Sequence, residues 1–222
     1  MFNITDLIYR VPNYLSDVEC NLLIAEYESR SSESDLEKCY DSNTGIDTYS
    51  TFNRILLNEG TLFYDILFRK TEKAINEYIK YLDSFGSFHI PAIKQSMLYS
   101  HMYRLLKYEV GSKIHPHTDH EPHIYGSITF NLNDDYTGGV FKFFNGKYEV
   151  NLGKGEMMIW PADYFWVHEV TPVKTGARYS TNSFLLSLPE EIRTNSMNNI
   201  DEMMSMYYST NNKQIQKKYL IE

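Results

Sequence analysis

Histidine and aspartate alternate in a short stretch, HPHTDHEPH, that begins at His115. In a β-strand, side chains two residues apart point to the same face, with their Cα atoms about 6.5–7 Å apart. Two such side chains can bind one ion through bonds of about 2.0–2.2 Å. Three in a row cannot, because the outer two lie about 13 Å apart along a regular strand. The geometry therefore allows one adjacent pair plus a ligand from elsewhere in the chain.

We expect this distant ligand to be His168, in the run FWVHEV, and the adjacent pair to be His117 and Asp119. Two imidazoles and a carboxylate on one face of the ion, with the other positions open, are the ligand set of non-haem Fe(II) oxygenases. Zinc is the competing metal, because catalytic zinc sites also use two histidines and a carboxylate. The other histidines of the stretch are expected to be exposed or to support the ligands: His115, His120 and His123.

Arg178 favours iron over zinc. It begins the run RYS, ten positions after His168. A guanidinium binds a carboxylate through two parallel hydrogen bonds and stays charged when buried. Strand alternation puts Ser180 on the same face, where its hydroxyl can bond the same carboxylate. A zinc hydrolase has no special use for this arginine, whereas 2-oxoglutarate carries a carboxylate for it, so we expect Fe(II) as the metal and 2-oxoglutarate as co-substrate.

Four motifs follow one another in order: YEVGSKIHPHTD from Tyr108, DDYTGGVFKF from Asp134, GKGEMMIWP from Gly153 and HEVTPVKTGARYS from His168. Together they resemble the prolyl 4-hydroxylase-like branch of the 2-oxoglutarate/Fe(II)-dependent oxygenases, and the resemblance covers roughly residues 10–30 and 97–188. It implies a double-stranded β-helix and Tyr108 as a further contact of 2-oxoglutarate. It also implies C–H hydroxylation with release of succinate and CO₂, with L-ascorbate as a reductant.

The same resemblance implies a prolyl residue in a peptide or protein as the substrate. Collagen-type members usually carry lysine where Arg178 stands, and glutamate is common where Val140 stands. Residues 40–54 are expected to form a long polar loop that closes over the substrate. Arg54 in that loop is a candidate substrate contact, as is Trp166, which strand alternation places on the face of His168.

Three alternatives stay open. A free amino acid or another small molecule is a substrate for the same iron chemistry. A non-catalytic β-sandwich that binds metal is the alternative from another class. A nucleic-acid dealkylase is disfavoured, because Phe184 stands where the dealkylase branch carries a second arginine. The formal charge of −8 likewise argues against nucleic acid or an anionic membrane as a partner.

The pattern as a whole predicts a mainly β (α+β) protein: a double-stranded β-helix core of the jelly-roll or cupin kind, with N-terminal packing helices. With 222 residues, we expect one domain over 1–222. The expected parts are helical support over about 1–96, the β-core over about 97–188 and a polar tail over about 189–222. Helices are expected over 14–29 and 63–82, short strands from 97 onward, a loop with short strands over 31–60, and a helical stripe in the tail. The stripe comprises Ile200, Met203, Met204 and Tyr207.

The sequence says less about the cellular compartment and the oligomeric state. Cys20 and Cys39 are the only cysteines, and we expect reduced thiols because a domain of this size needs no disulfide. The N-terminus lacks a basic flank followed by an apolar segment, and no apolar run reaches the length that crosses a membrane. We therefore expect a cytoplasmic protein without a membrane partner, and the oligomeric state stays open.

Overall fold

The computed structural model describes residues 3–41 and 45–211. By its internal contacts the chain divides into two units, residues 1–187 and residues 188–222. Every strand among the described residues lies in the first unit. The second unit contains the helix α4 (Glu190–Asn211). The expected tail is thus helical over most of its length, while the side chains of Met203, Met204 and Tyr207 lie outside the described part, so the stripe stays a prediction.

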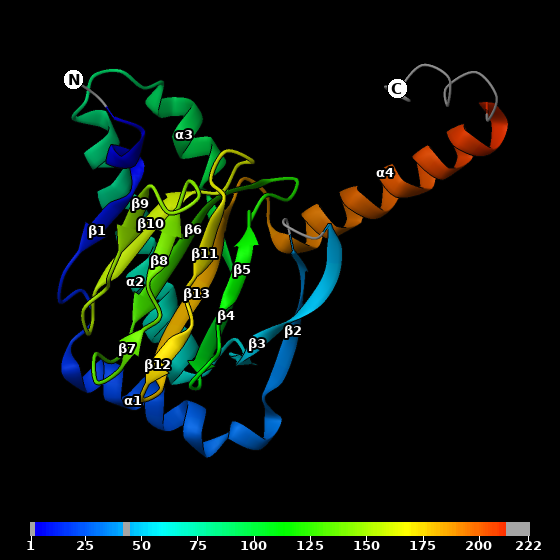
Figure 1. The fold of residues 1–222 in the computed structure, drawn as a ribbon. Helices are drawn as coiled ribbons and strands as arrows, with labels where there is room; N and C mark the ends of the chain where they lie inside the picture. The colour runs from blue at the N-terminus through cyan, green and yellow to red at the C-terminus, as the bar shows by residue number, and fades with distance from the viewer. Residues whose placement is uncertain (1–2, 42–44, 212–222) are drawn as a thin grey trace. The chain divides into compact units, whose positions relative to one another are not determined.

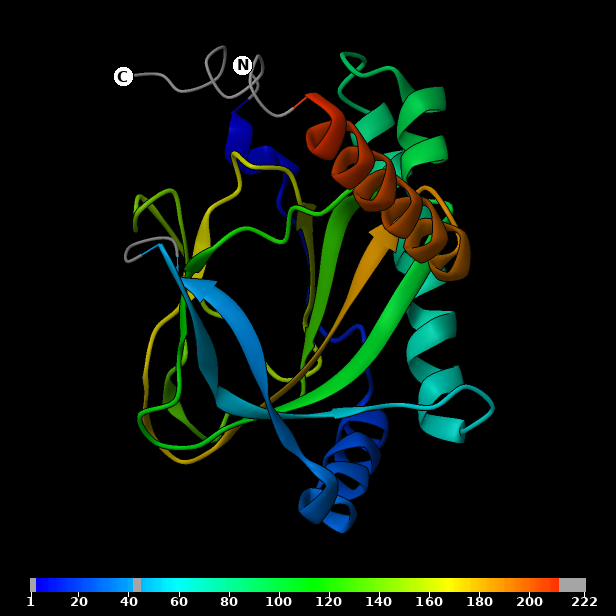
Figure 2. The same cartoon turned by 90° about the vertical axis from the view of Figure 1, so that its right-hand side faces the viewer.

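Two antiparallel sheets form the first unit, as Figures 1 and 2 show. The larger has seven strands in the order β1-β10-β6-β13-β4-β3-β2, and the smaller has four in the order β5-β11-β8-β9. A two-stranded sheet pairs β12 with β7. The strands are β1 (Tyr9–Val11), β2 (Asp35–Asp41), β3 (Ile46–Leu56), β4 (Tyr99–Tyr108), β5 (Ile114–His117), β6 (Ile124–Asn131), β7 (Thr137–Gly138), β8 (Phe141–Phe143), β9 (Tyr148–Val150), β10 (Met157–Pro161), β11 (His168–Val170), β12 (Val173–Thr175) and β13 (Arg178–Leu186). The mainly β class that the sequence predicts is confirmed.

Alternation along each strand divides the large sheet between two cores. Along β4, Leu105 packs into the core under the helices, whereas Leu106 packs into the core between the two sheets. The same alternation separates Met157 from Met158 in β10. The inner face of the large sheet therefore points at the smaller sheet, and the expected site residues lie in this space.

Helices cover the outer face of the large sheet. The helix α1 (Asp17–Ser29) begins at its N-cap Ser16, whose hydroxyl accepts a hydrogen bond from the amide of Glu19. The long helix α2 (Leu62–Asp83) buries an apolar stripe against the sheet and confirms the periodicity over 63–82. A short helix that the sequence did not indicate, α3 (Ile90–Ser96), leads into β4.

The expectation of a long polar loop over 40–54 is wrong for the described residues. Strands β2 and β3 form a hairpin that extends the large sheet, and β3 pairs with β4 from Asn53 to Leu56. Residues 42–44 lie outside the described part of the chain. Tertiary pairing decides this segment, because a polar sequence becomes a strand when a neighbouring strand satisfies its backbone groups.

Candidate metal centre and active site

The three expected metal ligands come together at the paired ends of β5 and β11. His117 in β5 and His168 in β11 are direct cross-strand partners, and Asp119 follows two residues after His117. His117 Nε2 lies 3.4 Å from Asp119 Oδ1, and His168 Nε2 lies 3.6 Å from Asp119 Oδ2. One ligand atom from each of the three side chains lies within 4.8 Å of the others. This spacing suits a single ion with bonds of about 2.0–2.2 Å.

Hydrogen bonds orient these side chains. His117 Nδ1 lies 2.8 Å from the carbonyl oxygen of His115, and His168 Nδ1 lies 3.0 Å from that of Trp166. Because a carbonyl only accepts, each Nδ1 carries the hydrogen and each Nε2 keeps its lone pair for a metal. The hydroxyl of Ser127 donates to Asp119 Oδ2 at 2.6 Å and fixes the carboxylate.

Electrostatics keep His168 and Asp119 in the protonation states that bind metal. Burial lowers the pKa of His168 to about 4, although Asp119 opposes the shift, so the imidazole is neutral at pH 7. Burial on its own raises the pKa of Asp119, but the neighbouring imidazoles and the Ser127 hydroxyl hold it below its ordinary value. A neutral imidazole and an ionised carboxylate are the forms that ligate a divalent cation.

Arg178 lies deep in the protein and is 1% exposed. Among the described residues, its Nε, Nη1 and Nη2 atoms have no hydrogen-bond partner. The guanidinium carbon lies 4.9 Å from the ring centre of Tyr108 and 5.2 Å from that of Phe141. Such ring contacts do not replace hydrogen bonds, and a buried charge without a partner is costly. The donor set therefore fits a bound carboxylate.

A cavity of about 410 Å³ opens between the two sheets. The three expected metal ligands line it, together with Tyr108, which is the cross-strand partner of Arg178. Ser180 also lines the cavity, two residues along the same strand. Arg178 lies behind Tyr108 and Phe141 and is not itself one of the lining residues. Burial raises the pKa of Tyr108 to about 12, against the opposing effect of Arg178, so its phenol keeps its proton as a donor.

Comparison with known proteins agrees with this geometry. Residues 103–186 match the model of the 2OG-Fe(II) oxygenase superfamily. The sequence matches none of the curated proteins with which it was compared. The predicted resemblance to this family is thereby confirmed over the β-core.

Several solved structures resemble this chain in fold. A prolyl-4-hydroxylase from Pseudomonas putida is 15% identical, with a TM-score of 0.60 over 82% of this chain and 94% of that one. The viral collagen prolyl hydroxylase from Paramecium Bursaria Chlorella virus-1 is 14% identical, with a TM-score of 0.58 over 82% and 97%. A Trichoplax adhaerens prolyl hydroxylase, solved with a hypoxia inducible factor peptide, is 13% identical, with a TM-score of 0.56 over 82% and 84%. These similarities confirm the double-stranded β-helix fold.

A double glycine, Gly138 and Gly139, packs beside the buried arginine. Gly138 and Gly139 have φ angles of +81° and +62°. A Cβ on Gly138 would lie 2.2 Å from the carbonyl oxygen of Pro172, and one on Gly139 would lie 2.8 Å from Arg178 Cδ. The turn therefore needs glycine for its backbone conformation and for its close packing.

Replacing Gly139 by alanine is expected to raise the 2-oxoglutarate concentration needed for half-maximal succinate release by about tenfold. The added methyl group displaces Arg178, while the three expected iron ligands are untouched. The matched control is Gly146→Ala, because Gly146 has a φ of +78° but its Cβ would meet only Lys142 Cδ at 3.8 Å. Equal effects of the two substitutions would show that backbone strain alone is responsible.

The two expected substrate contacts lie elsewhere. Trp166 is 2% exposed and packs between Phe143 and Phe144 in the core, because it precedes β11 and strand alternation does not apply to it. Arg54 Nε donates to Asp35 Oδ1 at 2.9 Å and Nη1 to Glu37 Oε1 at 2.7 Å, outside the cavity that holds the expected ligands. Trp166 is thus a core residue, and Arg54 belongs to an ionic network of the hairpin.

Other residues of the site were not found from the sequence. Ser127 is one, and its signal is strand alternation, which puts it on the inner face of β6 beside Asp119. Glu37 and Arg104 also line the cavity, and they meet only because the hairpin folds beside β4.

None of the helices within the described residues combines the length and the apolar character that a membrane span requires.

Proposed function

We propose that this oxygenase hydroxylates a prolyl residue in a peptide or protein, using Fe(II) on His117, Asp119 and His168 and 2-oxoglutarate on Arg178. The observation that carries the proposal is the combination of two features, one lining the cavity and one directly behind its wall. One is a set of three ligand atoms within 4.8 Å of one another. The other is a buried guanidinium that lacks a partner among the described residues.

The side chains fit the groups assigned to them. Two imidazoles and a carboxylate leave coordination positions open for a bidentate 2-oxo acid and for dioxygen. When bound, the iron supplies the activation of dioxygen that oxidises the substrate C–H bond and converts 2-oxoglutarate to succinate and CO₂. Arg178 orients the far carboxylate of 2-oxoglutarate, with Ser180 and Tyr108 as further donors. The aromatic wall around His168 excludes water, since its ring lies 5.5 Å from that of Phe143 and 5.2 Å from that of Trp160.

Two features support a peptide as the substrate. The structures named above are prolyl hydroxylases, and one of them holds a peptide. In this chain, Tyr164 and Phe165 are each 64% exposed, and their ring centres lie 4.4 Å apart. The Tyr164 ring meets His120, a cavity-lining residue, at 5.8 Å. Exposed aromatic faces beside a cavity suit an extended proline-containing strand, because they pack on pyrrolidine rings.

Screening for turnover tests the proposal. With Fe(II), 2-oxoglutarate and ascorbate, proline-containing peptides are expected to stimulate succinate release and to gain the mass of one oxygen atom. Free proline and other free amino acids are the comparison substrates, and the His168→Ala variant controls for enzyme-independent succinate. Efficient hydroxylation of a free amino acid, with proline peptides untouched, would replace the peptidyl substrate by a small molecule and leave the oxygenase chemistry intact.

A further inference from the structure

A second arginine lies on the same inner sheet face as Arg178. Arg104 in β4 lines the cavity and is 4% exposed. Its cross-strand partner in β13 is Asn182, and the partner of Asn182 in β6 is Thr129. All three line the cavity, so they form one row across the sheet. Asn182 is four residues from Arg178 along β13, which corresponds to roughly 13 Å in a strand, so this row is separate from the 2-oxoglutarate end.

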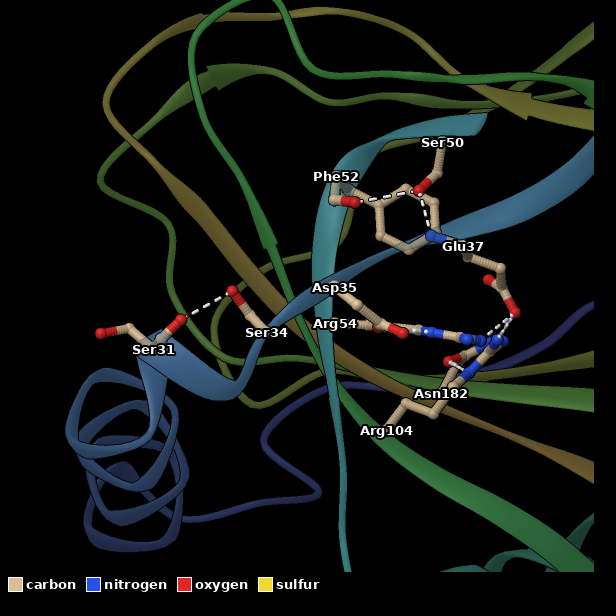
Figure 3. A network of polar contacts seen from close by, with 9 residues as sticks. All are labelled: Ser31, Ser34, Asp35, Glu37, Ser50, Phe52, Arg54, Arg104 and Asn182. Carbon is tan, nitrogen blue, oxygen red and sulfur yellow. Dashed lines mark hydrogen bonds and ion pairs between the residues drawn. The ribbon is translucent and has the colours of Figure 1, made fainter. Parts of the chain in front are cut away.

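Hydrogen bonds hold Arg104 in a defined orientation (Figure 3). Its Nε donates to Asn182 Oδ1 at 2.8 Å, and its Nη1 binds Glu37 Oε1. The guanidinium carbon lies 5.0 Å from the ring centre of Phe184. Neither hydrogen bond uses Nη2. Because Asn182 Oδ1 is occupied as an acceptor, its Nδ2 remains a donor. Both residues line the cavity, so each has a donor group for a ligand there.

The charge of Arg104 is balanced within the network that Figure 3 shows. Glu37 Oε1 also accepts from Arg54 Nη1 at 2.7 Å, and Arg54 Nε donates to Asp35 Oδ1 at 2.9 Å. Two guanidinium groups thus meet two carboxylates. Lys38 and Glu121, which also line the cavity, carry opposite charges.

A balanced donor pair suits an uncharged acceptor. A peptide carbonyl oxygen can accept from both donors without a charge of its own. A free carboxylate would in addition meet the carboxylate of Glu37 at close range, and like charges repel. The row thus has the chemistry of a site for a backbone carbonyl.

We propose that Arg104 and Asn182 bind a backbone carbonyl oxygen of the peptide substrate and, with Glu37, select peptides over free amino acids. This inference rests on the proposed function and names the recognition element of the same cavity. Arg104 and Asn182 hold the substrate at a distance from the iron ligands. Glu37 holds Arg104 in place and sets the local charge.

Replacing Arg104 by methionine tests the donor role. The KM for an amidated proline peptide is expected to rise about tenfold to a hundredfold, which is the range for one lost hydrogen bond to a charged group. The KM for 2-oxoglutarate is expected to change far less. The matched control is Arg54→Met, because Arg54 binds the same Glu37 oxygen but lies outside this cavity, and its peptide KM is expected to stay within about threefold of wild type.

Removing the charge of Glu37 distinguishes a role in substrate recognition from a role in supporting the fold. In Glu37→Gln, the carboxylate that repels a substrate carboxylate is gone. Two forms of one peptide are compared, one ending in a free proline carboxylate and one amidated. We expect the KM of the free form divided by the KM of the amidated form to be about tenfold lower in Glu37→Gln than in wild type. A residue that only supported the hairpin would change both KM values equally. Thermal unfolding checks each variant, and if Arg104→Met does not fold, Arg104→Lys and Asn182→Ala carry the same test.

The outcomes keep this inference distinct from the proposed function. If wild type hydroxylates the amidated peptide but Arg104→Met keeps its peptide KM, or matches Arg54→Met, the inference is wrong and prolyl hydroxylation stands. An unchanged KM ratio in Glu37→Gln also overturns the selection of peptides over carboxylates. If wild type consumes 2-oxoglutarate without hydroxylating the amidated peptide, the peptidyl function and the inference fail together.

Discussion

Alanine at His117, Asp119 or His168 is expected to abolish succinate release and to weaken Fe(II) binding at least a hundredfold. Each substitution removes one of three ligand atoms that lie within 4.8 Å of one another, and two remaining ligands hold a divalent ion poorly. Metal content after dialysis and succinate release with 2-oxoglutarate and peptide are the two measurements.

Neighbouring histidines supply the controls for these variants. His115 contributes its backbone carbonyl to the orientation of His117, and His115→Ala keeps that carbonyl. The ring of His120 contacts Tyr164, and His120 is not one of the three residues whose ligand atoms converge. Both alanine variants are therefore expected to retain iron. Near-wild-type turnover in His168→Ala, or loss of iron in His115→Ala alone, would show that the metal has a different ligand set.

Arg178→Ala is expected to raise the 2-oxoglutarate requirement roughly 30-fold to several-thousand-fold, which corresponds to about 2–5 kcal/mol for one lost partner of a buried charge-assisted pair. Iron binding should persist. Within the described residues the guanidinium of Arg178 forms no hydrogen bond, so its removal breaks no bond to the three ligands. Arg178→Lys should recover part of the loss, since it keeps the charge but not the paired donors. Titrating 2-oxoglutarate against succinate release measures the effect.

A binding measurement independent of turnover accompanies this series. Saturating 2-oxoglutarate should raise the melting temperature of the wild-type protein with Fe(II), because a ligand that binds only the folded state stabilises it. The rise should be small in Arg178→Ala and intermediate in Arg178→Lys. An equal rise in wild type and Arg178→Ala would exclude this arginine as the partner of 2-oxoglutarate.

Local sequence rules were sufficient for several elements. The Ser16 cap and the apolar period of α2 predicted two helices because caps and helical periodicity are properties of neighbouring residues. Short runs rich in β-branched and aromatic residues, separated by turn residues from residue 97 onward, predicted the β-core for the same reason. Strand geometry, which is also local, limits how many side chains of one strand can reach one ion. It therefore predicted a ligand outside the stretch from His115 to His123.

Only the tertiary structure decided which distant residues meet. His168 stands opposite His117, and Arg178 opposite Tyr108, because of cross-strand registers that depend on the whole sheet. The hairpin of β2 and β3 looks like a polar loop in the sequence, and it becomes two strands because β4 offers an edge to β3. Glu37 reaches Arg104 only through that pairing, and Trp166 lies in the core because the chain turns before β11. Residue types and short spacings thus determined the chemistry available to this protein, whereas long-range backbone pairing, which no local pattern encodes, decided where that chemistry is assembled.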